Sequence, residues 1–234
     1  MEGMILAAGL GTRLRPLTND RPKALVEVEG HTLLEMCIMR MAVAGVTHCV
    51  VNVHHFGEMM IEYLNGRSWP CRITISDERG MLLDTGGALK HAAPLFDGGD
   101  SVLIHNVDVL SGIDLRDVEE CHRRAGNLVT LCVSKRDTKR MLMFDESGML
   151  SGRAGDECLN DGMKEALAFS GITVVSPKLF EMLPEADHAY PVVDEYIRLA
   201  KAGERIGYYK HKKEIWLDVG KPETLAKAAE FLER

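Results

Sequence analysis

The stretch of sequence with the clearest chemical potential is a glycine-containing segment near the amino end that is crowded with positive charge. Residues 6–18 read Leu-Ala-Ala-Gly-Leu-Gly-Thr-Arg-Leu-Arg-Pro-Leu-Thr, and Pro-Lys-Ala-Leu follows at 22–25. Glycines let a backbone approach phosphate oxygens and direct N–H groups at them. The cations between positions 13 and 23 are Arg13, Arg15, Arg21 and Lys23. The segment therefore predicts a binding site for a polyphosphate ligand.

Two other phosphate-binding motifs share features with this segment but lack required residues. A dinucleotide-binding G-x-G-x-x-G needs a third glycine, and Leu14 occupies that position. This disfavours a dinucleotide-dependent oxidoreductase. A Walker A loop needs lysine directly after its last glycine, whereas Thr12 follows Gly11. A glycine turn with solvated basic residues is the remaining structural alternative.

Two aspartates stand at positions suited to holding a metal ion. Asp108 lies just past the apolar run 101–106, and Asp218 ends the short run that begins at Trp216. In an open α/β sheet the carboxyl ends of strands line the ligand crevice, so both carboxylates could face it. Two carboxylates, phosphate oxygens and waters together form a magnesium site. The alternative is that either aspartate serves only in a turn or a helix cap.

The elements that must position these residues alternate between strands and helices. The apolar patterns predict strands at 4–8, 48–53, 73–76, 101–106, 128–133, 169–175, 205–209 and 215–218. They predict helices at 32–44, 56–64, 87–95, 114–125, 192–200 and 224–232, with a hairpin near 141–144 and 149–150. Such alternation implies βαβ crossovers. We expect an α/β fold with one doubly wound, mostly parallel mixed sheet and helices on both faces. We expect one domain over residues 1–234, without a C-terminal β-helix domain.

Composition limits the partners and the compartment. The formal net charge of −7 repels nucleic acid and anionic membranes at long range. The start lacks a basic region before its apolar run, and no apolar run approaches the roughly 20 residues of a membrane span. The six cysteines are scattered without a C-x-x-C pair, which favours reduced core thiols; they are Cys37, Cys49, Cys71, Cys121, Cys132 and Cys158. We expect a cytoplasmic protein with no nucleic acid or membrane partner.

Residues 6–18 and 22–25 resemble the signature of the sugar-1-phosphate nucleotidyltransferases, which is close to L-A-A-G-x-G-T-R-L-x-P-L-T followed by P-K-x-L. The resemblance implies that Arg13 and Lys23 act on the triphosphate as catalytic cations. It implies that the nucleotide lies against the loop formed by Leu6, Ala7, Ala8, Gly9, Gly11 and Thr12. It also assigns Asp108 and Asp218 to the metal, expected to be Mg²⁺.

The same resemblance places further residues around the substrates. Thr85, Gly86 and Gly87 match a segment near the nucleoside, and Glu78 falls where family members hold the base. A carboxylate there could accept uracil N3–H or the paired N–H donors of guanine. The resemblance assigns Asn106, Gly171, Asp194 and Glu195 to the sugar side.

Two departures from the family pattern affect the acceptor. Val107 replaces the usual glycine before the metal aspartate, where a side chain could crowd the sugar. The frequent E-K-P segment is absent between Lys135 and Ser170, which removes one expected phosphate-binding lysine. Lys164 is a candidate replacement.

The resemblance extends over nearly the whole chain and implies transfer of a nucleoside monophosphate from a nucleoside triphosphate to a sugar 1-phosphate, with release of pyrophosphate. UTP and GTP are the expected donors, since the short middle region looks most like N-acetylmuramate-1-phosphate uridylyltransferases and mannose-1-phosphate guanylyltransferases. The alternatives are a cytidylyltransferase acting on phosphocholine and a non-catalytic nucleotide-binding regulatory subunit. The expected partners are the nucleoside triphosphate and the sugar 1-phosphate, and we also expect that the protein can form a homodimer.

Overall fold

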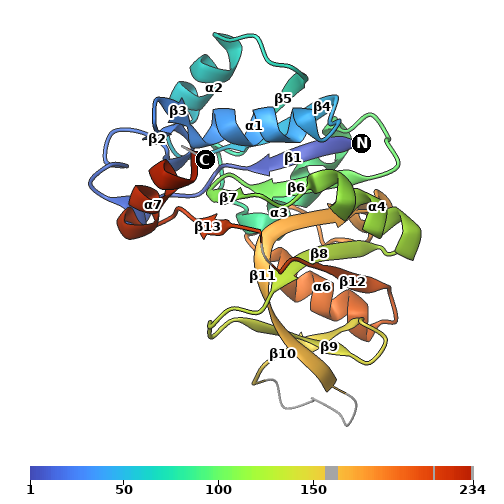
Figure 1. Ribbon diagram of the computed structural model, residues 1–234. Coiled ribbons are helices and arrows are strands. Elements are labelled where there is room, and N and C mark those ends of the chain that lie inside the picture. The colour runs from blue at the N-terminus through green and yellow to red at the C-terminus, as the bar shows by residue number, and fades with distance from the viewer. Residues whose placement is uncertain (156–162, 213, 233–234) are drawn as a thin grey trace.

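A nine-stranded mixed sheet forms the centre of the computed structural model, which describes residues 1–155, 163–212 and 214–232 (Figure 1). Its strands are β1 (Glu2–Leu6), β4 (His48–Val53), β5 (Arg72–Asp77), β6 (Val102–Asn106), β8 (Val129–Ser134), β9 (Met141–Asp145), β10 (Leu150–Arg153), β11 (Met163–Val175) and β12 (Ile206–Lys210). Seven follow the order β10-β9-β11-β6-β1-β4-β5, while β8 pairs with β11 and β12. Two small sheets pair β2 (Glu27–Val28) with β3 (His31–Thr32), and β7 (Val109–Ser111) with β13 (Trp216–Asp218).

The parallel part of the sheet consists of β6, β1, β4 and β5 side by side. Every residue of β4 is buried, and in β1 and β6 only the last residue is partly exposed. Strands covered on both faces read as continuous apolar runs, which is why the sequence pattern located them. Their carboxyl ends lie at one edge, where Leu6 pairs with Asn106. This edge carries the segment expected to bind phosphate.

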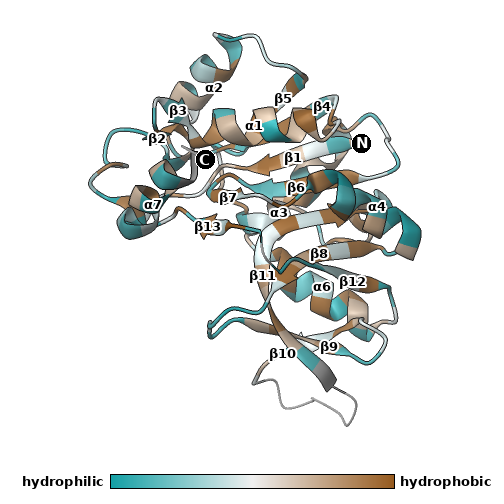
Figure 2. Cartoon of the chain, viewed as in Figure 1, coloured by the Kyte–Doolittle hydropathy of each residue, from teal (hydrophilic) through white to brown (hydrophobic). Residues whose placement is uncertain are grey.

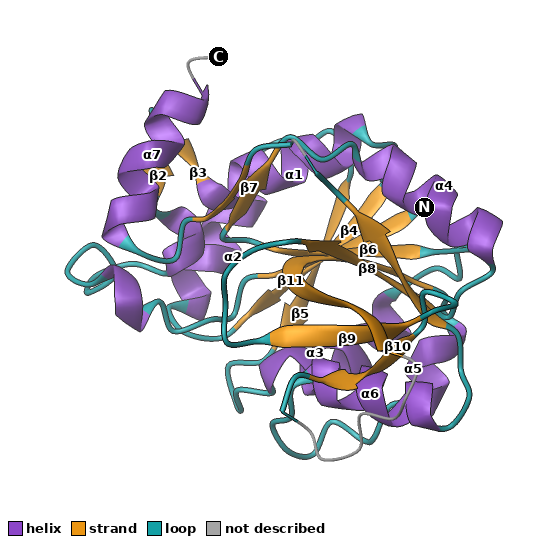
Figure 3. Cartoon of the chain, turned by 60° about the horizontal axis from the view of Figure 1, so that its bottom comes forward, coloured by secondary structure: helices purple, strands orange, loops and turns teal. Residues whose placement is uncertain are grey.

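The described residues form seven α-helices, most of which flank the sheet. They are α1 (Leu33–Val43), α2 (Gly57–Asn65), α3 (Asp84–Ala92), α4 (Leu115–Ala125), α5 (Lys178–Met182), α6 (Val192–Lys201) and α7 (Pro222–Leu232). Figure 3 shows the strands lying between α1 and α4 on one side and α3, α5 and α6 on the other. Short 3-10 turns occupy Thr12–Leu14, Lys23–Leu25 and Ala93–Leu95.

Two apolar cores follow from the alternation of side chains along each strand. Ile5 and Val51 point into the core beneath α1, while Met4 and Val50 point into the core beneath α3. Figure 2 shows apolar residues on the strands and polar residues on the outer face of α4. The expected doubly wound α/β architecture is therefore confirmed.

The long strand β11 connects the parallel part of the sheet to an antiparallel part. Its end pairs with β6 on one side and β8 on the other, its middle also pairs with β8, and its beginning pairs with β9 of the β9–β10 hairpin. The pairing register with β8 shifts between Phe169 and Thr173, and Gly171 within this bulge has a φ of +74°. The expected hairpin is confirmed, but the prediction that this strand begins at 169 was wrong. It begins at Met163 because β9 supplies pairing partners for five of the six further residues.

Several predicted boundaries also differ from the structure. The first strand ends at Leu6 instead of position 8, because the N–H groups of Ala7 and Ala8 turn to a side chain instead of the sheet. The helix predicted at 87–95 begins at Asp84 and ends at Ala92. Pro94, which lacks an N–H donor, lies in the 3-10 turn that follows. The short strands β2, β3 and β7 and the five-residue helix α5 were not predicted.

Candidate active site

The phosphate segment leaves the sheet at Leu6 and is held by a buried asparagine. The Oδ1 atom of Asn52 accepts hydrogen bonds from the N–H groups of Ala7 at 2.6 Å and Ala8 at 3.3 Å. Asn52 lies on β4 and is 3 % exposed. Its Nδ2 atom donates to Glu78 Oε1 at 2.9 Å. Asn52 therefore fixes the start of the segment and connects it to the residue expected to read the base.

Asn52 was missed by the sequence analysis. The available signal was one amide side chain within the apolar run His-Cys-Val-Val-Asn-Val of β4. A buried polar side chain must be hydrogen-bonded, so its presence in a fully covered strand indicates a specific partner. Which partner it meets depends on the parallel pairing of β1 with β4.

The turn of the phosphate segment requires glycine at position 11. Gly11 has a φ of +64°, and its carbonyl oxygen accepts hydrogen bonds from Leu14 N–H at 2.9 Å and Thr18 Oγ1 at 2.8 Å. A Cβ atom on Gly11 would lie 3.0 Å from the Cβ atom of Lys23. One on Gly9 would lie 3.7 Å from Lys23 Nζ. The loop thus packs closely around Lys23, and Thr12 opens the 3-10 turn beside it.

Four charged side chains converge at the carboxyl edge of the sheet, and we call them the charge cluster: Arg13, Lys23, Asp108 and Asp218. Lys23 Nζ lies 2.7 Å from Asp108 Oδ2, and Arg13 Nη2 lies 3.8 Å from Asp218 Oδ2. The position that a Cβ atom on Gly220 would take lies 2.7 Å from Arg13 Nη2, 2.8 Å from Asp218 Oδ1 and 3.2 Å from Asp108 Oδ2. The two carboxylates and the guanidinium therefore approach one point next to Gly220. Any side chain at position 220 would occupy this point and push the three groups apart.

The pairing of β7 with β13 brings the two aspartates together. Asp218 pairs with Val109, and the N–H of Val219 donates to the carbonyl oxygen of Asp108 at 2.9 Å. Asp218 Oδ1 also accepts the N–H of Gly220 at 2.9 Å. Residues more than 100 positions apart in the sequence thus become direct neighbours.

The charge cluster fits a divalent cation that is also held by substrate. Two carboxylates leave most of an octahedral coordination shell for phosphate oxygens and waters, which is the usual arrangement for Mg²⁺. Within the described residues, one group of three potential ligands exists, formed by Glu2, His48 and Asp97. It lies at the amino end of β1, opposite the phosphate segment. Its members already hydrogen-bond one another and the backbone N–H groups of Asp97 and Gly99.

Glu78 is a buried carboxylate with an incomplete set of partners. It is 3 % exposed, and its Oε2 atom lacks a hydrogen-bond partner of normal geometry in the described chain. Burial raises the pKa of Glu78 to about 7, although hydrogen bonds from Asn52 and from the backbone of Leu83 oppose the shift. A ligand N–H donor would supply the partner that Oε2 lacks.

The first turn of α3 uses its predicted nucleotide-binding residues for packing inside the protein. The Thr85 N–H is bonded to the side chain of Asp84, and Thr85 Oγ1 accepts the N–H of Val192 at 2.9 Å. The Gly86 N–H donates to the carbonyl oxygen of Tyr190 at 2.8 Å. A Cβ atom on Gly86 would lie 2.3 Å from the Tyr190 ring, and Gly87 is similarly close to the backbone of residue 188. A direct role for this turn toward the nucleoside stays a prediction.

The residues predicted for the sugar side divide into two places. A Cβ atom on Gly171 would lie 2.9 Å from Asn106 Nδ2, so these two residues are neighbours next to Asp108. Asp194 instead forms an ion pair with Arg153. Glu195 accepts a hydrogen bond from Arg198 on its own helix at 2.7 Å. Among the described residues, neither Asp194 nor Glu195 forms an ion pair or hydrogen bond with a member of the charge cluster.

Val107 does not obstruct the site. Its side chain is 1 % exposed and belongs to the apolar core beneath α1. The side chain of Lys164, the candidate replacement for the missing lysine, lies outside the described residues, as does Cys158.

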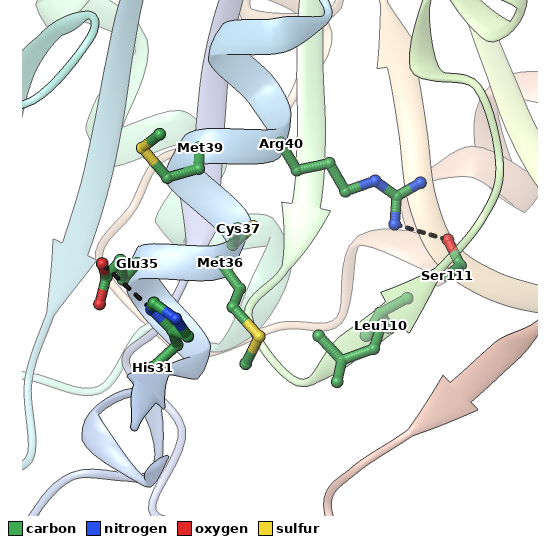
Figure 4. A pocket seen from close by; sticks show the side chains of 9 residues that line it. His31, Glu35, Met36, Cys37, Met39, Arg40, Leu110 and Ser111 are labelled. Atoms are coloured by element: carbon green, nitrogen blue, oxygen red, sulfur yellow. Dashed lines mark hydrogen bonds and ion pairs between the residues drawn. The ribbon is translucent and has the colours of Figure 1, made fainter. Parts of the chain in front are cut away.

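A separate cavity lies behind the strand that follows Asp108. It has a volume of about 400 Å³ and is lined by α1 and β7, with Met36 and Leu110 on opposite walls (Figure 4). Arg40 extends from α1 to β7, where it donates to Ser111 Oγ at 2.8 Å and to the carbonyl oxygen of Ile113. These bonds attach β7, the strand that directly follows Asp108, to α1.

The structure thus has a doubly wound sheet whose carboxyl edge carries the charge cluster. Residues 2–142 match the model of the nucleotidyl transferase family, and the chain belongs to this family. The expected resemblance to nucleotidyltransferases, and with it the expectation of an enzyme, is thereby confirmed.

Individual relatives extend this similarity over almost the entire chain. The N-acetylmuramate alpha-1-phosphate uridylyltransferases of Caulobacter vibrioides and Neisseria meningitidis are 34 % and 30 % identical. Each comparison covers 94 % of this chain and 92 % or 93 % of the relative. A mannose-1-phosphate guanyltransferase of Candida albicans is 29 % identical over 95 % of this chain but only 62 % of its own length.

Solved structures show the same fold. HddC of Yersinia pseudotuberculosis complexed with GMP-PN superimposes with a TM-score of 0.78 over 99 % of both chains, at 21 % identity.

Replacing Glu78 by glutamine is expected to stabilise the protein at pH 8 and to have little effect at pH 4. The folded-state pKa of about 7 exceeds the ordinary value of 4.5, so the folded protein loses stability as pH rises through this window. Removing the buried charge should raise the free energy of unfolding by on the order of 1–3 kcal/mol above pH 7. Thermal unfolding at pH 4, 6 and 8 measures the difference. An equal stabilisation at all three pH values would contradict a buried charge at Glu78.

Proposed function

We propose that this protein transfers uridine monophosphate from UTP to a sugar 1-phosphate, with N-acetylmuramate 1-phosphate as the first candidate acceptor and Mg²⁺ as the metal. The observation that carries the proposal is the convergence of Arg13, Lys23, Asp108 and Asp218 beside the phosphate segment. The uridylyltransferases match this chain over nearly their full length, which favours UTP over GTP. The relatives also favour a sugar 1-phosphate over phosphocholine as the acceptor.

The reaction needs no general base. A phosphate monoester has a second pKa of about 6, so its oxygen is already ionised near neutral pH. This oxygen forms a bond to the α-phosphorus of the nucleotide, the bond from that phosphorus to the β-phosphate oxygen breaks, and pyrophosphate leaves. The barrier arises from repulsion between two polyanions and from charge that develops on the oxygens around the α-phosphorus.

The charge cluster supplies the positive charge and the orientation that this step requires. Arg13 extends from the phosphate loop toward the point where the carboxylates meet, and about half of its side chain is exposed to a ligand. Lys23 is largely buried and held against Asp108. Asp108 and Asp218 would hold Mg²⁺, which when bound would neutralise phosphate charge and keep the α-phosphate in position. The backbone of Ala7 to Gly11 would cradle the phosphates.

Glu78 would orient the base. Its unpartnered Oε2 atom can accept one N–H of uracil, and the Asn52 side chain links this carboxylate to the phosphate loop. Because guanine also presents N–H donors, GTP is the second candidate donor.

We further propose that residues 1–234 act as a single domain in the cytoplasm. The five described cysteines are unpaired thiols, and burial raises the pKa of Cys37 to about 12. A thiol of that kind is inert as a nucleophile. Among the described helices, none has the length and apolar character needed to span a bilayer. The formation of a homodimer stays a prediction.

Arg13→Ala and Asp108→Asn are each expected to lower kcat by about 10² or more, the scale observed when one donor to a transition state is lost. Magnesium-dependent release of pyrophosphate, measured at saturating substrate, provides the test. Arg21→Ala is a matched control, because Arg21 lies in the same segment but pairs with exposed Asp20. Wild-type rates in both cluster variants would refute the assignment.

Among combinations of UTP, GTP, CTP and dTTP with a panel of sugar 1-phosphates and phosphocholine, UTP with N-acetylmuramate 1-phosphate is expected to give the highest kcat/KM. Mass spectrometry of the product identifies the nucleotide and the sugar. A preference for GTP would overturn the assignment of the base and leave the enzyme class intact. Absence of pyrophosphate release from every pair would instead support the non-catalytic nucleotide-binding alternative.

A further inference from the structure

Arg136 is a half-buried cation that is fixed in place without a carboxylate partner. Its guanidinium stacks on the indole ring of Trp216, with 3.5 Å between Cζ and the ring centroid. It donates to the carbonyl oxygen of Phe169 at 2.6 Å and to Ser170 Oγ at 3.3 Å. A guanidinium has five N–H donors, so three remain without an acceptor in the described part of the chain.

The neighbouring cations are engaged elsewhere. Lys135 and Lys210 both pair with Glu165, and Arg153 pairs with Asp194. Arg136 forms no ion pair of this kind with a described residue. Its charge is therefore not neutralised by a described carboxylate and stays available to a ligand.

Arg136 lies between two parts of the candidate site, the proposed metal ligand Asp218 and the sugar-side residues Gly171 and Asn106. Trp216, on which it stacks, begins the strand that ends at Asp218. The indole Nε1 atom donates to the carbonyl oxygen of Ser170 at 2.8 Å. The next residue is Gly171, which lies against Asn106. An anion bound to Arg136 would thus be close to both Asp218 and the pair of Gly171 and Asn106.

A second contact orients the Ser170 hydroxyl toward this arrangement. His211 is buried, and burial lowers its pKa, so the imidazole is neutral at pH 7. Its Nε2 atom lies 2.8 Å from Ser170 Oγ. If the hydroxyl donates to the imidazole, its oxygen is free to accept from Arg136. The guanidinium is then fixed by the Trp216 ring, Phe169 and Ser170 before any ligand arrives.

The energetics indicate an anion as the missing partner. Burial of a charged group is costly unless it is paired, and burial lowers the pKa of Arg136. Asp218 is the charge that partly offsets this effect. Once Asp218 holds a divalent cation, its charge is shared and Arg136 lacks a counter-charge. A phosphate group on the acceptor would provide one.

We propose that Arg136 binds the phosphate group of the acceptor sugar 1-phosphate, an inference that rests on the proposed function. A planar guanidinium can hold two oxygens of a phosphate monoester at once. The third non-bridging oxygen then remains free to attack the α-phosphorus of the nucleotide. Arg136 thereby supplies, from the segment after β8, the positive charge that the absent E-K-P lysine would have provided.

The test compares Arg136→Ala and Arg136→Lys with wild type in steady-state assays of pyrophosphate release. Arg136→Ala should raise KM for the sugar 1-phosphate by about tenfold or more, the effect of one lost charged contact, and leave KM for the nucleoside triphosphate within about twofold. Arg136→Lys retains the charge but loses two-point binding, so its KM for the sugar 1-phosphate should also rise. Lys135→Ala is the matched control, because this adjacent cation is exposed and pairs with Glu165.

Each outcome bears on a different claim. An unchanged KM for the sugar 1-phosphate in Arg136→Ala, or a fall in kcat alone, would overturn the role of Arg136 and leave the proposed function standing. The role of Arg136 would also be overturned if Lys135→Ala raised the KM for the sugar 1-phosphate by the same factor. If Arg136→Ala fails to fold, Arg136→Lys decides by the same criterion. A wild-type protein that is inactive with every sugar 1-phosphate would overturn the proposed function itself, and this inference with it.

Discussion

The structure depends on one electrostatic constraint, which is that two carboxylates and two cations must occupy the same small region at the carboxyl edge of the sheet. Asp108 and Asp218 repel each other, and their proximity is tolerated because Lys23 and Arg13 lie beside them. Gly220 leaves the space in which these groups meet. The short β7–β13 ribbon, attached to α1 through Arg40, maintains this arrangement. Nearly everything proposed about the chemistry follows from it.

A second buried network connects the loop at Ala7 and Ala8 to Glu78 through Asn52. One amide side chain holds the backbone of Ala7 and Ala8 with its oxygen and Glu78 with its nitrogen. The raised pKa of Glu78 shows that this carboxylate is held at a cost to stability. Sites that bind ligands often retain such locally unfavourable groups, because the ligand completes their hydrogen bonds. The loop and Glu78 are therefore linked through the two ends of one amide side chain.

The acceptor side shows how a family fold can carry a changed set of contacts. The position usually held by glycine is Val107, whose side chain is accommodated by the apolar core. Asp194 and Glu195, which the family resemblance placed near the sugar, are engaged by Arg153 and Arg198. Arg136, which stacks on Trp216 two residues before Asp218, lies outside the motifs that identify the family.

The sequence by itself determined the order of buried strands and amphipathic helices, the phosphate segment, and the identity of Arg13, Lys23, Asp108 and Asp218. The apolar runs, the glycine turn and the clustered cations are local features that can be recognised without knowing what they pack against. Asp108 and Asp218 were instead assigned from their places at strand ends and from the family resemblance. Strand ends, the β7–β13 pairing, and the roles of Asn52 and Arg136 were decided only by the tertiary structure. Each of these features depends on a partner that is distant in the sequence. The role of a polar side chain such as Asn52 or Arg136 can be inferred only once the folded structure identifies the groups that it contacts.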